Sequence, residues 1–148
     1  MHYNIQLNLP ESWQQVSENF TDESGTDISH IEAHLYDEAL GRDEAMVDVY
    51  VGDMPEDSCA EDQAFSNYAD IVGFDDDDDP EDFNPIGRIS FNNRNAFCFE
   101  ALCEDDSPMI CICQEPRKGV LAIICVAAKD DEALGAAVGL VERSLRIK

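Results

Sequence analysis

The strongest constraint on the fold of this chain is an alternation of apolar and polar residues that recurs along it. The alternation is clearest at residues 45–52, where three valines alternate with Met46, Asp48 and Tyr50. Successive side chains of a β-strand point to opposite faces, so a period of two predicts a strand with one buried face. The same pattern predicts a first strand at residues 3–9.

Residues 28–36 predict another strand of this kind. A helix stays open as an alternative, because the spacing of Ile28, Ile31 and Leu35 fits one face of a helix as well. The preceding segment, residues 14–27, is polar and has no clear period. It therefore yields no prediction of an element.

The last third of the chain predicts four further strands. They are separated by short segments rich in Asn, Asp, Pro and Gly, which favour turns. Short connections join antiparallel neighbours. The four predicted strands are residues 86–91, 96–103, 109–114 and 120–127, and the last of these is apolar throughout, as expected of a central strand.

Two segments have the spacing of helices. In the first, residues 58–73, Ser58 and Glu61 have the spacing of a capping box, and Gly73 favours a helix end. The second helix is expected to open at Asp130, since acidic residues stabilise the positive end of the helix dipole. The predicted apolar stripes are Ala64, Phe65, Tyr68, Ile71 and Val72 in the first helix and Leu134, Val138, Val141 and Leu145 in the second.

These elements predict the α+β class. We expect an antiparallel sheet of about six to seven strands flanked by helices, as an α/β/α sandwich. A length of 148 residues suits one domain with its own core, so residues 1–148 are expected to form a single domain.

The charge is distributed very unevenly. The chain has 33 acidic and nine basic residues, and residues 1–87 hold 24 of the acids and a single base, Arg42. Nucleic-acid binding is excluded, because it needs clustered Lys and Arg against phosphates. Binding to an anionic membrane is disfavoured for the same reason. An acidic field attracts basic partners, so the expected partner is a basic protein.

Seven of the acids lie within residues 75–82. Like charges at this density do not pack together, so the run is expected to form a solvated loop, with a loose cation site left open. An EF-hand is excluded, because its sixth and twelfth positions would be Pro80 and Ile86. Trp13 is an aromatic candidate for partner binding, with packing at a strand end as the alternative. The acidic candidates are Asp75, Asp76, Asp77, Asp78, Asp79, Glu81 and Asp82.

His30, Glu32 and His34 alternate along the strand expected at 28–36 and so share one face. Imidazole and carboxylate groups in this arrangement are candidate ligands of a divalent metal. The alternative is a solvated polar face opposite an apolar one. No other cofactor is indicated.

The six cysteines are expected to be reduced and mostly to line the sheet. A zinc site is disfavoured, because Cys111 and Cys113 are two apart on a strand, roughly 7 Å from each other. Cys103 and Cys111 form a redox pair only if the hairpin register places them opposite. The remaining three cysteines are Cys59, Cys98 and Cys125.

Secretion, membrane insertion and catalysis are not indicated. The chain has no basic start followed by an apolar stretch and no run of about 18 apolar residues, which predicts a cytoplasmic protein. Motifs of hydrolases, phosphate loops and dinucleotide sites are missing, so no enzymatic activity is expected.

Three features resemble the PsbP-like fold. Residues 3–13 form a strand that runs into a Leu-Pro-x-x-Trp turn, a strand, helix and hairpins follow, and a strand with an acidic helix leads to residues 141–148. The resemblance implies an antiparallel sheet between helices. It is shared with photosystem accessory proteins, a Ran-binding nuclear import factor and the Eag-type chaperones of type VI secretion, and it implies no catalytic residues.

Three functions are compatible with these observations. The first is a non-catalytic protein-binding module that uses its acidic surface. The second is a chaperone or adaptor that shields an apolar segment of a secreted effector, which needs an exposed apolar face. The third is a divalent-metal-binding protein. A monomer or a homodimer is expected.

Overall fold

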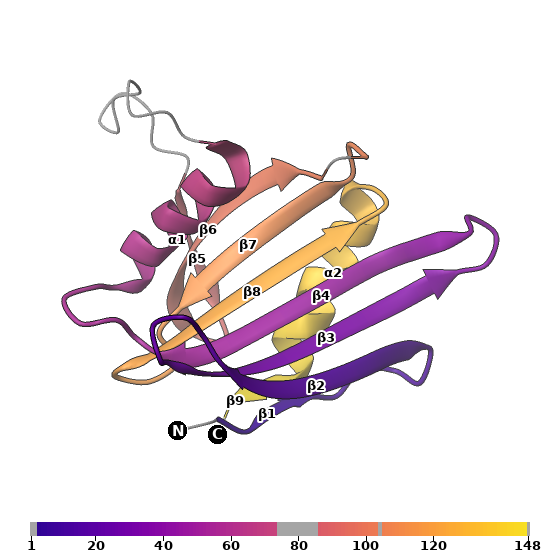
Figure 1. The fold of residues 1–148 in the computed structure, drawn as a ribbon. Coiled ribbons are helices and arrows are strands. Elements are labelled where there is room, and N and C mark those ends of the chain that lie inside the picture. The colour runs from indigo at the N-terminus through magenta and orange to yellow at the C-terminus, as the bar shows by residue number, and fades with distance from the viewer. Residues whose placement is uncertain (1–2, 74–85, 104, 148) are drawn as a thin grey trace.

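A seven-stranded antiparallel sheet forms the centre of the molecule (Figure 1). The computed structural model describes residues 3–73, 86–103 and 105–147. The strands follow the spatial order β2-β3-β4-β8-β7-β6-β5, and each neighbouring pair is antiparallel. Their bounds are β2 (Trp13–Thr21), β3 (Asp27–Asp37), β4 (Arg42–Asp53), β5 (Gly87–Phe91), β6 (Arg94–Leu102), β7 (Pro108–Gln114) and β8 (Val120–Ala128).

Two helices and a small second sheet accompany this main sheet. They are α1 (Ala60–Tyr68), the π-helical turn η1 (Ala69–Gly73), α2 (Asp131–Ser144), and the paired strands β1 (Ile5–Leu7) and β9 (Leu145–Ile147). The predicted α+β class and the antiparallel sheet are thereby confirmed. Within the described ranges, no helix is long and apolar enough to cross a membrane.

One face of the main sheet carries the larger core. Val47, Val49 and Val51 of β4 are completely buried on this face, together with Ile124 of β8. Helix α2 packs over them, and the β1–β9 pair lies beside it (Figure 1). The alternation that predicted a half-buried strand at 45–52 is confirmed.

The opposite face is covered only in part. Helix α1 packs on β6 and β7, where Ala64 and Tyr68 join a second cluster with Phe99 and two cysteines. The part formed by β2, β3 and β4 carries no helix of the described residues (Figure 1). We call this part the open face, and its side chains are Gln14, Val16, Glu18, Phe20, Ile28, His30, Glu32, His34, Met46, Asp48 and Tyr50, with Asp43 beside His34. The predicted sandwich is thus incomplete, because α1 has only nine residues and packs on β6 and β7 alone.

The segment for which no element was predicted, residues 14–27, contains all of strand β2 except its first residue, Trp13. It lies at an edge of the sheet, and eight of its nine residues are exposed. A strand that buries neither face needs no apolar alternation, so the sequence carries no signal for it. The neighbouring β3 is a strand because it pairs with β2 on one side and β4 on the other, which excludes the helical alternative.

The starts of the two helices differ in how well they were predicted. In α2, Oδ1 of Asp130 accepts a hydrogen bond of 2.7 Å from the backbone N–H of Ala133, as expected of a helix cap. The capping box predicted for α1 is wrong. Cys59 is the residue at the cap, and Ser58 lies one position too early to reach the free amides; its Oγ accepts a hydrogen bond from Gln63 instead.

Replacing Asp130 with Ala should lower the free energy of unfolding by about 1 kcal/mol, because a first-turn amide loses its acceptor. Unfolding in denaturant measures the effect. The matched control is Asp131→Ala, which removes an acid from the same turn and leaves the cap intact, at a cost of at most about 0.5 kcal/mol. Equal losses in the two variants would contradict the capping role.

Candidate functional site

A cluster of charged side chains lies on the open face, with His30 at its centre. This imidazole is buried. Its Nδ1 lies 3.1 Å from Oε1 of Glu18 on β2, and its Nε2 lies 2.9 Å from Oδ1 of Asp48 on β4. The ring stacks on Tyr50 with 4.2 Å between centroids. Three neighbouring strands therefore meet at one imidazole.

The arrangement is repeated at His34, four residues along β3. Its Nδ1 lies 2.7 Å from Oδ2 of Asp43, and its Nε2 lies 2.9 Å from Oε1 of Glu32. This imidazole is more exposed than that of His30. The open face thus holds two histidines, each between two carboxylates.

The hydrogen bonds define the protonation of both histidines. A carboxylate only accepts, so an imidazole that bonds to two of them must donate from both nitrogens, which requires the imidazolium form. Burial lowers the pKa of His30, but the hydrogen bonds and negative charge of Asp48 and Glu18 outweigh it and raise that pKa above the ordinary 6.5. The same balance, with Asp43 and Glu32, raises the pKa of His34.

Tyr50 shares this environment. Burial and the nearby charge of Asp48 raise the pKa of its phenol above the ordinary 10, so the hydroxyl stays protonated at neutral pH. Its ring covers one side of the His30 imidazole. The site therefore combines four carboxylates, two imidazoles and a protonated phenol.

The predicted metal ligands are brought onto one face but not to one point. His34 and Glu32 contact each other, whereas His30 bonds to Glu18 and Asp48 instead. Across the described ranges, no group of three or more His, Cys, Asp or Glu side chains is placed to hold a metal ion. The trio does not converge on one point, because His30 turns to Glu18 and Asp48 while Glu32 bonds to His34.

Three members of the cluster were not recognised in the sequence. Glu18 lies in the segment that had no period, and Asp43 lies before the strand predicted at 45–52. Asp48 was seen only as a polar position in a strand. The register of β2, β3 and β4 brings them to the histidines, and no local pattern carries that register.

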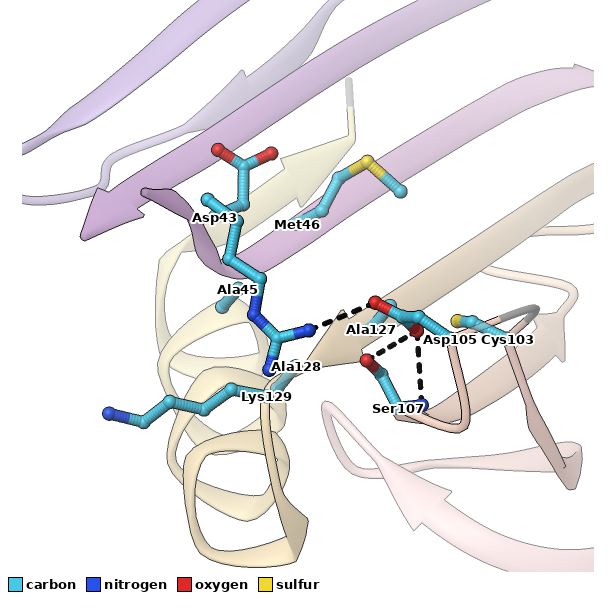
Figure 2. Close-up of a pocket in the computed structure, with 10 residues that line it drawn as sticks. Asp43, Ala45, Met46, Cys103, Asp105, Ser107, Ala127, Ala128 and Lys129 are labelled. Atoms are coloured by element: carbon cyan, nitrogen blue, oxygen red, sulfur yellow. Dashed lines mark hydrogen bonds and ion pairs between the residues drawn. The ribbon is translucent and has the colours of Figure 1, made fainter. Parts of the chain in front are cut away.

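A cavity of about 530 Å³ lies at one end of the sheet (Figure 2). Asp105 accepts two hydrogen bonds from Ser107 there, and these bonds hold the pKa of Asp105 below its ordinary value. The side chain of Lys129 points away from Asp105 and Ser107 (Figure 2). Both bases at the cavity are already paired: Arg42 lies 3.1 Å from Asp105, and Lys129 lies 3.3 Å from Glu44. A ligand would have to displace these pairs.

Four of the six cysteines lie on strands of the sheet, in agreement with the prediction that most of them line it, and three of these four are buried. Cys111 and Cys113 lie beneath α1, and Cys98 lies on the opposite face. Cys59, in contrast, is exposed at the start of α1. The two remaining thiols, Cys103 and Cys125, are partly buried.

The proposed redox pair of Cys103 and Cys111 is wrong. The register of the hairpin places Phe99 opposite Cys111, and Cys103 follows the end of β6. Cys111 is instead opposite Cys125 on β8, with 3.3 Å between the sulfur atoms.

The thiols of this pair are not set up as nucleophiles. A hydrogen bond with Cys113, together with burial, raises the pKa of Cys111, and the hydrogen bond with Cys111, together with burial, raises the pKa of Cys125. Thiolates are the reactive species, so both groups are inert at neutral pH.

The other predicted binding residues have different outcomes. Trp13 is only 8% exposed and belongs to the larger core, so it packs at the start of β2 and is not available to a partner. The acidic run Asp75–Asp82 lies outside the described residues, and its role stays a prediction.

Comparison with known proteins adds no relative. No protein family matches the chain, no curated protein is similar to it, and no solved structure matches it.

The two imidazoliums predict how stability depends on pH. Their pKa values are raised in the folded chain, so their stabilisation is complete below about pH 6.5 and is lost as the pH rises through the raised values. The free energy of unfolding, measured in denaturant, should therefore fall as the pH rises above about 6.5. His30→Gln should reduce this fall and cost about 2 kcal/mol at pH 6, because it breaks hydrogen bonds to charged groups.

His2→Gln is the matched control for this experiment. It removes the third histidine of the chain and measures the share of that histidine in the pH dependence. A pH dependence that survives the combined loss of His30 and His34 would contradict the assignment.

The burial of the thiols predicts their reactivity. With an alkylating reagent at neutral pH, Cys59 should react first, and Cys98, Cys111 and Cys113 should react only after unfolding. Mass spectrometry of peptides identifies the modified positions. Cys59→Ser should remove the fast phase without exposing the others, and modification of Cys111 in the native protein would overturn the burial argument.

Proposed function

We propose that the chain is a non-catalytic protein-binding module whose acidic surface attracts a basic protein. The observation that carries the proposal is the open face, where no helix of the described residues covers the sheet and four carboxylates surround two histidines. Its most exposed carboxylate is Glu18, whose side chain is 60% exposed. The negative formal charges of the four carboxylates outnumber the positive charges of the two imidazoliums.

Further acids lie at both ends of β2. Glu11 precedes the strand, and Asp22 and Glu23 form the turn that follows it; all three are exposed. The single base among residues 1–87, Arg42, is paired with Asp105. A surface with this sign of charge raises the rate of encounter with basic partners and repels acidic ones.

The arrangement of the titratable groups favours binding over catalysis. Both nitrogens of His30 and of His34 are already hydrogen-bonded to carboxylates, so neither imidazole serves as a general base. The thiols of Cys111 and Cys125 have raised pKa values. These observations support a module that presents charge without activating a nucleophile.

The chaperone hypothesis has less support. It needs a continuous apolar face, and the large apolar side chains that are exposed in the described residues are scattered over several elements. They are Val16, Phe20, Tyr36, Leu40, Ile71 and Leu102. The relationship with the PsbP-like fold stays a proposal that rests on the sequence features given above.

Binding of decalysine, a basic probe of no particular sequence, tests the proposal. Its dissociation constant should rise at least tenfold between about 50 mM and about 300 mM NaCl, because salt screens exposed charges. Fluorescence anisotropy gives the constant. An affinity for decalysine that does not depend on the salt concentration would contradict the proposal.

A pair of triple variants locates the attraction. Neutralising three acids of the open face should weaken binding several-fold more than neutralising three exposed acids elsewhere. The open-face variant is Glu18→Gln, Glu32→Gln and Asp48→Asn, and the control is Glu56→Gln, Glu61→Gln and Glu132→Gln. A third variant with Asp75, Asp76, Asp77, Asp78 and Asp79 changed to Asn measures the share of the acidic run. Equal effects of the first two variants would show that only total charge matters and would contradict a role for the open face.

A further inference from the structure

Strand β2 offers a long edge to the solvent. It is the first strand in the sheet order and pairs with β3 over all nine of its residues, without a bulge. Within the described residues, no strand pairs with its outer edge. Only Trp13 of the strand is buried. Alternate N–H and C=O groups of β2 therefore point outward with no partner in the sheet.

β2 has few of the usual protections of an edge strand. Sheets shield their edges with short strands, Lys, Pro or bulges. The sequence WQQVSENFT contains no Lys and no Pro, and Glu18 is its only charge. The other edge of the same sheet differs, because β5 has five residues and carries Arg88. The contrast makes β2 the edge that is open to pairing.

The side chains of β2 on the open face follow a symmetric pattern. Val16 is 67% exposed, Glu18 follows two residues later, and Phe20, also exposed, follows after two more. Alternate side chains of a strand share a face, so the outer strand presents an apolar, an acidic and an apolar group in a row. On the other face, the corresponding positions after Trp13 carry Gln, Ser, Asn and Thr.

We propose that β2 binds an extended segment of a basic protein by adding it to the sheet as an eighth strand. The segment would contain Lys or Arg with an apolar residue two positions before and two positions after it. The inference rests on the proposed function and names the partner's conformation and the pattern of its side chains.

The pattern follows from the geometry of neighbouring strands. Side chains directly opposite on one face have Cβ atoms about 4.5–5.5 Å apart, close enough for a cation to pair with Glu18 and for apolar groups to cover Val16 and Phe20. The pattern reads the same in both directions, so it suits a parallel or an antiparallel strand. Main-chain hydrogen bonds supply affinity, and the alternate side chains supply specificity.

Charge complementarity favours a basic segment over a second copy of this chain. Pairing of β2 with the β2 of a second copy would bring together residues 1–87 of both copies, each with 24 acidic residues and one basic residue. It would also place the two Glu18 carboxylates on neighbouring strands, where like charges repel. A basic segment meets the opposite field.

The first test uses the unmodified protein and a nine-residue peptide, Ser-Thr-Val-Thr-Lys-Thr-Val-Thr-Ser, with blocked ends and a neutral dye. Two further peptides carry N-methyl groups either on the Val and Lys amides or on the Thr amides between them. All N–H groups of alternate residues point to the same side of a strand. One methylated peptide should therefore lose at least tenfold in affinity, and the other should stay within about threefold of the parent peptide.

The outcomes separate this inference from the proposed function. If the parent peptide binds and both methylated peptides bind as well as it does, the segment does not add as a strand, and only the acidic-surface proposal stands. If decalysine binds and the parent peptide does not, strand addition is again wrong. If neither binds at low salt, both proposals fail. Self-association through β2, seen as a dimer in the absence of peptide, would also overturn the inference.

The second test exchanges the charges. Glu18→Lys should weaken binding of the Lys peptide at least tenfold and should create binding of a peptide in which Glu replaces the central Lys. Glu56→Lys is the matched control: it makes the same change of net charge in the exposed loop between β4 and α1 and should leave the preference for the Lys peptide. Equal effects of both substitutions would refute the contact with Glu18. Circular dichroism checks that the Glu18 variant, in which His30 loses one partner, is folded.

Discussion

The pairing of β4 with β8 is the interaction on which the rest of the structure depends. β4 is the longest strand, and the pair joins the β2–β3 side of the sheet to the β5–β7 side. Val47, Val49 and Ile124 are fully buried along it. Burying a side chain of this size contributes about 1.5–3 kcal/mol, so this row alone strongly favours one register. Helix α2 packs on this pair, and α1 packs on β6 and β7 at the opposite face.

The same pairing produces the polar cluster as a consequence. When the valines of β4 face α2, the residues between them must face the other way, because the period of a strand is two. Asp48 and Tyr50 are thereby directed to the open face, where β3 supplies His30 and β2 supplies Glu18. A slip of one residue would exchange the two faces and bury Asp48 in the core. Core and cluster are two results of one register.

The open face and the edge of β2 share a cause. A sheet of seven strands exposes more surface than two short helices cover, and α1 and α2 both lie away from β2. The strands that are left bare must carry groups that tolerate water, and here these are carboxylates and protonated imidazoles. Part of the acidic excess of residues 1–87 therefore arises because the uncovered strands of the sheet carry carboxylates on their exposed face.

Local patterns predicted much of the fold. The strand at 45–52, the hairpins of the last third and the helix start at Asp130 agree with the structure, because each depends on alternation, turn residues or a cap within a few positions. Strand β2 was not predicted, because only its first residue is buried and it shows no apolar alternation. The capping box predicted at Ser58 was wrong, because the residue at the helix cap is Cys59. The cysteine pair escaped because strands have to be aligned before Cys125 is seen to face Cys111.

The candidate site was less accessible to prediction than the fold. Neighbouring residues are enough to show which segments are strands, where the chain turns and how its charge is divided, since those properties need no distant contact. The partners of His30 are 12 and 18 positions away, and the free edge of β2 exists only relative to six other strands. Register and edge depend on how the whole sheet packs against its helices, and so only the folded chain reveals them.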